Sequence, residues 1–92
     1  MNPTHNFMHH VYILQSLKNK SFYVGCTSDL EKRIAEHNRG DSYHTKKYMP
    51  WELIYFEAYR AKEDAYKREQ SLKLHAQGMR RLKERLQKSL IA

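Results

Sequence analysis

Two tyrosines, an arginine, a histidine and a glutamate hold unusual positions in this sequence, and together they could cleave a phosphate ester. Tyr12 and Tyr23 lie in two short apolar runs, and Arg33 and His37 are one helical turn apart. Glu69 falls on the apolar line of a later segment. An arginine can neutralise a phosphate, a glutamate can hold a divalent cation, and a phenol can hold or deprotonate a water molecule. These side chains are therefore the candidate catalytic set.

The two runs that carry the tyrosines predict a β-hairpin, because apolar side chains alternate along both and a polar connection of hairpin length joins them. If the turn centres on Lys18–Asn19, Tyr12 lies opposite Gly25 and Leu14 lies opposite Tyr23. Opposed residues share a face, so both phenols would point the same way, and Gly25 would leave space beside Tyr12. A register slip of one residue would separate the phenols.

The rest of the sequence predicts one α/β domain over residues 1–92, with a three-stranded antiparallel sheet flanked by helices in the order ββαβαα. Strands are expected at 11–15, 22–26 and 51–59, and helices at 28–38, 61–74 and 79–90. Ser28 and Glu31 form a candidate capping box for the first helix. Gly78 is expected to separate the last two helices. The residues with candidate chemistry fall in a core of about 11–75, before the C-terminal helix.

Helical spacing predicts that His37 and Glu69 face inward. His37 follows Ile34 by three residues and Leu30 by seven, which places it on the inward stripe beside Arg33. Glu69 lies on the apolar line of the second helix and needs an arginine, a lysine or a metal ion as partner. One alternative joins Glu69 and Arg33 in a buried salt bridge and leaves both tyrosines as ordinary core aromatics.

The charge balance favours a polyanionic partner, with nucleic acid first. Lysine and arginine number 17 against 10 acidic residues, so the net charge is +7 and the isoelectric point is near 9.6. Solubility alone is the other explanation, and the basic run of the last helix is either a solvated face or a phosphate-binding one. His44, beside Tyr43 in a basic loop, is likewise either a substrate contact or solvated. The candidate nucleic-acid contacts are Lys46, Lys47, Arg68, Lys73, Arg80 and Arg81.

The cysteine content and hydropathy predict a cytoplasmic protein without a membrane span. Cys26 is the single cysteine, which excludes an internal disulfide framework and favours a reducing compartment. Cys26 alternates with apolar residues, so we expect it to pack as a small hydrophobe. No run approaches the roughly 20 apolar residues that a membrane-spanning helix needs.

The ordered set of candidate residues resembles the GIY-YIG nuclease family, specifically its small standalone domains. The family's two strand motifs align with His10-Val11-Tyr12 and Tyr23-Val24-Gly25. Its helix signature aligns with Arg33 and His37 in DLEKRIAEHNRG, and its metal-binding acid aligns with Glu69 in EDAYKREQSLK. The resemblance covers most of the chain and extends to the N-terminal nuclease domain of the excision-repair endonuclease C subunit.

The resemblance implies a DNA hydrolase that uses one Mg²⁺ or Mn²⁺ ion, structure-selective or linked to repair, with RNA as a second candidate substrate. By this analogy Tyr12 is the general base or orients the attacking water, Glu69 ligates the metal, and Arg33 stabilises charge on the scissile phosphate. Tyr23 and His37 would form hydrogen bonds around the phosphate, and His37 is also a candidate for proton transfer. Because the ordinary pKa of tyrosine is about 10, a phenolate base would need cations close by.

The sequence departs from the family pattern at several positions. His10 stands where the first motif has glycine, Cys26 stands where some members have lysine, and no asparagine follows Asn38. The missing late asparagine favours an alternative, a non-catalytic nucleic-acid-binding module on the same scaffold. The intact catalytic set favours the hydrolase. A third alternative is an interaction domain that contains buried ion pairs.

Overall fold

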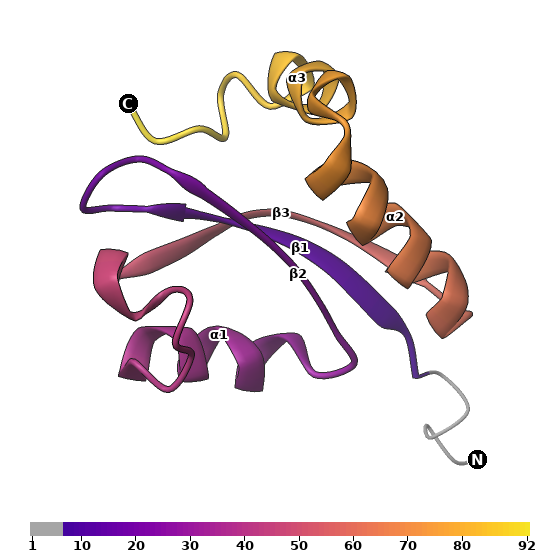
Figure 1. Ribbon diagram of the computed structural model, residues 1–92, viewed down its shortest axis with the longest axis horizontal. Helices are drawn as coiled ribbons and strands as arrows, with labels where there is room; N and C mark the ends of the chain where they lie inside the picture. The colour runs from indigo at the N-terminus through magenta and orange to yellow at the C-terminus, as the bar shows by residue number, and fades with distance from the viewer. Residues whose placement is uncertain (1–6) are drawn as a thin grey trace.

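The computed structural model describes residues 7–92 and confirms the α/β class and the order of elements (Figure 1). The elements are β1 (His9–Ser16), β2 (Phe22–Thr27), α1 (Leu30–Arg39), the 3₁₀ turn η2 (Lys46–Tyr48), β3 (Trp51–Tyr59), α2 (Lys62–Leu74) and α3 (Ala76–Arg85). The strands form one antiparallel sheet in the order β2-β1-β3, so β1 is central. None of the helices among these described residues is long and apolar enough to cross a membrane.

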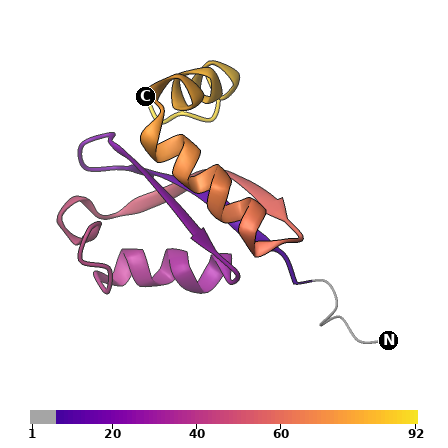
Figure 2. The same cartoon turned by 45° about the vertical axis from the view of Figure 1, so that its right-hand side comes forward.

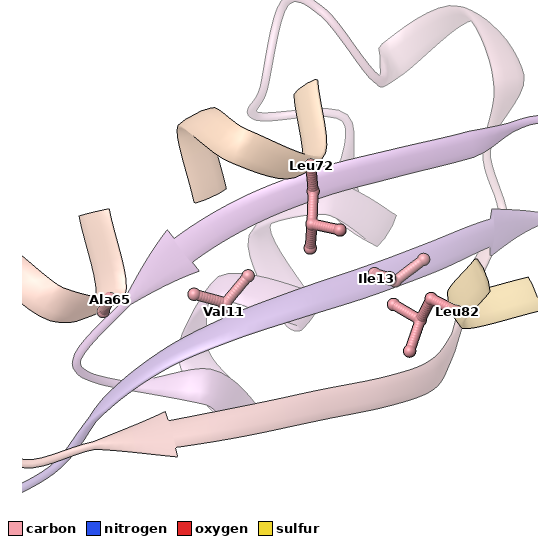
Figure 3. Close-up of a cluster of buried hydrophobic side chains, with 5 residues drawn as sticks. All are labelled: Val11, Ile13, Ala65, Leu72 and Leu82. Carbon is pink, nitrogen blue, oxygen red and sulfur yellow. The ribbon is translucent and has the colours of Figure 1, made fainter. Parts of the chain in front are cut away.

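The helices cover opposite faces of the sheet. In Figures 1 and 2, α1 and the segment that holds η2 lie on one side, while α2 and α3 lie on the other. The face toward α2 and α3 buries an apolar cluster of Val11, Ile13, Ala65, Leu72 and Leu82 (Figure 3). Cys26 is half-buried against this cluster, as expected for a small packing residue.

The face toward α1 carries the aromatic and polar residues of interest. Tyr12, Leu14 and Trp51 are buried there, and Tyr23 packs against them. The hairpin pairs Tyr12 with Gly25 and Leu14 with Tyr23, which confirms the register expected from the sequence. Both phenols therefore lie on one face, because paired residues of adjacent antiparallel strands point the same way.

The start of α1 differs from the expected capping box. The N-cap is Asp29, whose carboxylate accepts a hydrogen bond from the Lys32 backbone amide at 3.2 Å. A capping box at Ser28 and Glu31 is therefore wrong by one residue. The Asp29 side chain accepts from a first-turn backbone amide that has no partner within the helix, as a serine cap would. Its negative charge is also favourable at a helix N-terminus, so aspartate is the cap in place of Ser28. Gly40 ends the helix in the left-handed region at φ 82°.

The break between the last two helices is at His75 and not at Gly78. His75 has an extended backbone (φ −125°, ψ 104°), whereas Gly78 lies inside α3. The last helix also ends earlier than expected, at Arg85 rather than at residue 90. The chain then turns back toward β1, where the Ile91 amide donates to Gln15 Oε1 at 2.8 Å. This tertiary contact overrides the helical pattern of the last residues.

Candidate active site

A chain of hydrogen bonds runs from β1 through α1 to the loop before β3. The Tyr12 hydroxyl lies 2.8 Å from His37 Nε2, and His37 Nδ1 lies 2.7 Å from Thr45 Oγ1. The Thr45 hydroxyl donates to the Ser42 carbonyl at 3.5 Å, so it accepts from Nδ1–H. Nε2 is then free to accept the Tyr12 proton. Thr45 thus fixes the tautomer in which His37 can act as a base toward Tyr12.

Burial sets the protonation of this pair. Tyr12 is 1% exposed and His37 is 0% exposed. Burial and the neighbouring Tyr23 raise the pKa of Tyr12 to about 12, although the positive charge and hydrogen bond of Arg33 act in the opposite direction. Burial and the charge of Arg33 lower the pKa of His37 to about 4. At neutral pH the proton therefore stays on Tyr12, and His37 is a neutral acceptor.

The lowered pKa of His37 predicts acid sensitivity. An unfolded histidine has a pKa of about 6.5, so between that pH and about 4 the unfolded chain binds a proton that the folded protein excludes. The free energy of unfolding should therefore fall as the pH drops through this window, by at most about 1.4 kcal/mol per pH unit. Urea unfolding across the window checks this, with His37→Gln as the non-titrating comparison. The same pH slope in both proteins would contradict the assignment.

Tyr23 completes an aromatic group around His37. The centroid of the Tyr23 ring lies 5.0 Å from that of His37 and 6.3 Å from that of Trp51, both in edge-on arrangements. The Trp51 indole nitrogen donates to the Thr45 carbonyl at 2.8 Å, and the Asn38 side chain accepts from the Trp51 amide at 2.6 Å. The start of β3 is therefore joined to α1 and to the loop, which fixes the surroundings of His37.

Gly25 leaves the space that the Tyr12 hydroxyl fills. A Cβ atom built on Gly25 would lie 2.3 Å from Tyr12 Cζ and from its hydroxyl oxygen. Gly25→Ala should therefore displace the ring, break the bond to His37 and destabilise the protein by about 1–3 kcal/mol in urea unfolding. In the control Gly78→Ala, the new Cβ would make ordinary contact at 3.7 Å with Leu72. The free energy of unfolding should rise by up to about 1 kcal/mol, because alanine favours a helix more than glycine does. Equal effects of the two substitutions would contradict the packing argument.

Arg33 lies at the rim of the site and is held by its own helix. Its Nη1 atom is 2.9 Å from Glu36 Oε1, and about a third of its side chain is exposed. It is close enough to Tyr12 for its charge to lower the pKa of that phenol. The alternative salt bridge between Arg33 and Glu69 is not formed. The guanidinium keeps exposed surface on which a phosphate could bind.

Glu69 is buried on α2, as the helical spacing predicted, but its partner is a lysine. Glu69 is 9% exposed, and its Oε2 lies 3.0 Å from Lys73 Nζ. Lys73 Nζ also lies 5.9 Å from the centroid of the Tyr23 ring. The charge of Glu69 contributes to the raised pKa values of Tyr12 and Cys26, although burial dominates both. Glu69 is thus electrostatically coupled to the Tyr12 phenol.

The predicted nucleic-acid contacts are in different environments. Lys46 and Lys47 are exposed on η2, and Arg80 and Arg81 are exposed on α3, which covers the other face of the sheet. Lys73 forms an ion pair with Glu69. Arg68 forms a bidentate ion pair with Glu57 at 2.9–3.2 Å. That pair occupies the guanidinium, which argues against the predicted phosphate contact of Arg68.

Thr45 and Glu36 were not among the residues singled out from the sequence. Glu36 precedes His37 directly and follows Arg33 by three residues, so the i,i+3 spacing was a usable signal for its ion pair. Thr45 lies in a loop without periodicity, eight residues after His37. Loop conformation brings it to His37, and no local pattern encodes that contact.

The Glu69 carboxylate is the candidate ligand for a divalent cation. Among residues 7–92, no group of three or more histidine, cysteine or acidic side chains could form a closed metal site. The Glu69 carboxylate already contacts one cation, the Lys73 ammonium. Mg²⁺ is commonly bound through one or two carboxylates together with water and substrate phosphates. A single buried carboxylate such as Glu69 fits that mode.

The fold is consistent with a GIY-YIG catalytic domain, and the comparison with protein families identifies one. The family model described by that name matches residues 8–83, and the chain belongs to this family of the endonuclease superfamily. It is 38% identical to a UPF0213 protein of Halobacterium salinarum over 67 residues, which cover 72% of this chain and 86% of the relative. It is 43% identical to a UPF0213 protein of Clostridium perfringens over 67 residues, covering 72% and 71% of the two chains.

A UPF0213 protein of Staphylococcus aureus extends the match. It is 38% identical over 80 residues, which cover 84% of this chain and 96% of the relative. The relatives are therefore of similar size, and the alignment with them spans most of the described fold. No solved structure matches the chain significantly.

Proposed function

We propose that the protein hydrolyses phosphodiester bonds of DNA with the aid of one Mg²⁺ or Mn²⁺ ion bound at Glu69. The observation that carries this proposal is the hydrogen-bonded series Tyr12–His37–Thr45 beside Arg33, on one face of the sheet. It joins a proton donor, a neutral acceptor and a phosphate-binding cation in a single location. Membership of the GIY-YIG family supports the same chemistry.

The side chains divide the chemistry among them. Tyr12 orients the attacking water and takes its proton while passing its own proton to His37 Nε2, so one proton enters and one leaves the phenol. Thr45 keeps Nδ1 protonated throughout. Arg33 binds the non-bridging oxygens of the scissile phosphate, where charge develops in the transition state. Tyr23 donates a hydrogen bond to the same phosphate from the adjacent strand.

Glu69 would hold the divalent ion. When bound, the ion supplies positive charge that neutralises the phosphate, stabilises the leaving oxygen and lowers the pKa of nearby phenol and water. Lys73 would leave the Glu69 carboxylate on loading and become free to contact the DNA backbone. Substrate phosphates would complete the coordination, so affinity for the ion should be low until DNA is present.

The substrate proposed is DNA with a structural irregularity, in a repair-linked process. The net charge of +7 supports sequence-independent attraction to the phosphate backbone, which weakens steeply with salt. RNA is the second candidate substrate because none of the proposed substrate contacts requires a deoxyribose. We place the protein in the cytoplasm, since its lone cysteine is compatible with a reducing compartment.

The test is divalent-dependent cleavage of supercoiled plasmid, branched DNA and linear duplex by the purified protein. Nicking should appear with Mg²⁺ or Mn²⁺, disappear in EDTA and return when the ion is added back. Branched DNA should be cut faster than linear duplex of the same sequence. Absence of cleavage of every substrate with either ion would refute the hydrolase.

The second candidate function is a nucleic-acid-binding module without catalysis. The burial of Tyr12 and the Glu69–Lys73 pair favour it, because both groups need rearrangement before they can act on a substrate. This function predicts gel shifts of equal strength in EDTA and in Mg²⁺, with no turnover. The cleavage assay above separates the two functions.

A further inference from the structure

A basic and aromatic pocket lies next to the candidate active site, on the loop that joins α1 to β3. Its volume is about 510 Å³, and its lining residues are Tyr43, His44, Lys46, Lys47 and Tyr48. Cavities that bind small ligands or ligand fragments are commonly about 300–1,000 Å³. The pocket is therefore large enough for one nucleobase and its sugar.

The lining has the chemistry that single-stranded nucleic acid requires. Tyr43 is 88% exposed, and its ring meets the edge of His44 with centroids 5.7 Å apart. Lys47 Nζ lies 5.5 Å from the centroid of the Tyr48 ring, and Lys46 is exposed beside it. An exposed aromatic alone is common on protein surfaces. An exposed aromatic flanked by cations offers a stacking surface for a base and a counter-charge for its phosphates.

The loop is held from inside, so the pocket is preformed. Ser42 and Thr45 are buried between the exposed residues. The Ser42 carbonyl accepts hydrogen bonds from the Thr45 and Lys46 amides at 3.2 and 3.0 Å. The Trp51 indole nitrogen holds the Thr45 carbonyl at 2.8 Å. A preorganised loop loses little conformational entropy when a ligand binds.

The pocket is coupled to the catalytic hydrogen-bond series through one residue. Thr45 contacts His37 at 2.7 Å, and its two sequence neighbours, His44 and Lys46, line the pocket. Tyr48, another lining residue, packs against the buried cluster that contains Tyr12. Successive Cα atoms are about 3.8 Å apart, so the pocket begins within one residue of Thr45, the hydrogen-bond partner of His37. A nucleotide in the pocket would belong to the strand being cut.

We propose that this pocket binds an unpaired nucleotide of the DNA strand that is cleaved. The base stacks on Tyr43, and Lys46 and Lys47 contact the adjoining phosphates. A base inside a duplex is stacked on its neighbours and cannot enter, so the pocket selects single-stranded or branched DNA over continuous duplex. The inference rests on the proposed function and names the substrate class of the same site.

The test is DNA binding in EDTA, measured by fluorescence anisotropy with a labelled oligonucleotide as a single strand and as a duplex. The native protein should bind the single strand more tightly. Tyr43→Ala should weaken that binding about fivefold to a hundredfold and leave duplex binding nearly unchanged, whereas Tyr43→Phe should retain it. Tyr66→Ala is the matched control, since Tyr66 is 57% exposed and adjoins Lys62 and Lys67 on α2, the helix that lies on the opposite side of the sheet from α1 (Figure 2).

Three results would overturn the inference. They are unchanged single-strand binding in Tyr43→Ala, an equal loss of single-strand and duplex binding in Tyr43→Ala, and an equal loss of single-strand binding in Tyr43→Ala and Tyr66→Ala. EDTA prevents metal-dependent cleavage, so this outcome is independent of the nuclease assay. Cleavage without Tyr43-dependent binding would refute the pocket alone, and Tyr43-dependent binding without cleavage would refute only the proposed function.

Discussion

Glu69→Gln should reduce DNA cleavage by about 10²- to 10³-fold at saturating Mg²⁺ while the protein stays folded. The substitution keeps the size of the side chain but removes the negative charge that would hold the ion, and such an ion supplies several kcal/mol of transition-state stabilisation. Because the change removes an interaction with the ion, higher Mn²⁺ concentrations should restore part of the activity. Single-turnover cleavage of branched DNA across a metal titration measures both effects.

The stability of the same variant separates a metal ligand from a structural ion pair. Lys73 is 41% exposed, so its pair with Glu69 is a partly solvated i,i+4 bridge that contributes about 0.3–0.5 kcal/mol. In urea unfolding without added metal, the free energy of unfolding of Glu69→Gln should therefore differ little from that of the native protein. Glu63→Gln, an exposed change in the first turn of α2, serves as the control and should retain activity. A fall of several kcal/mol in the free energy of unfolding of Glu69→Gln would instead support the buried ion pair of an interaction domain.

The sequence predicted the parts of the site that depend on periodicity. Two-residue alternation and the turn position placed Tyr12 opposite Gly25, and the structure has that register. Helical spacing placed His37 and Glu69 on inward faces, and both are buried. These predictions succeed because one buried face fixes the register of a strand or the rotation of a helix.

The contacts between side chains were less predictable, because several partners compete for each charge. Glu69 could have met Arg33 or Lys73, and the nearer residue on the same helix is its partner. Arg33 is likewise held by Glu36, one turn away. Local i,i+3 and i,i+4 pairs require no further chain ordering, so they form in preference to a bridge between separate helices.

Contacts made by loops and by the chain ends were beyond the sequence patterns. The bond from His37 to Thr45 depends on the path of residues 40–48, and the early end of α3 depends on the return of Ile91 to Gln15. The loop has no period that reports burial, and the helical period of the last residues continues past the point where α3 ends. Tertiary hydrogen bonds decide both conformations, and they override local helical preference at the C-terminal end.

Tyr12→Phe should lower cleavage by about 10²- to 10⁴-fold, the contribution expected from a positioned proton-transfer group. The ring still fills the space above Gly25, so packing is retained. His37 Nε2 loses its 2.8 Å partner in a fully buried position, and we expect a cost of about 1–3 kcal/mol in the free energy of unfolding. Cleavage must therefore be measured at a temperature where circular dichroism shows the variant to be folded.

Tyr55→Phe is the control for this prediction, because it also removes a tyrosine hydrogen bond, here a partly buried one. The Tyr55 hydroxyl donates to Glu57 Oε2 at 2.7 Å, and its ring packs against the apolar cluster on the opposite face of the sheet. Tyr55→Phe should lower stability by a similar small amount and leave cleavage intact. If both variants lost activity in proportion to their stability, Tyr12 would be a packing residue. Selective loss of cleavage in Tyr12→Phe would assign a catalytic role to the Tyr12 hydroxyl, since this hydroxyl is the only group that the substitution removes.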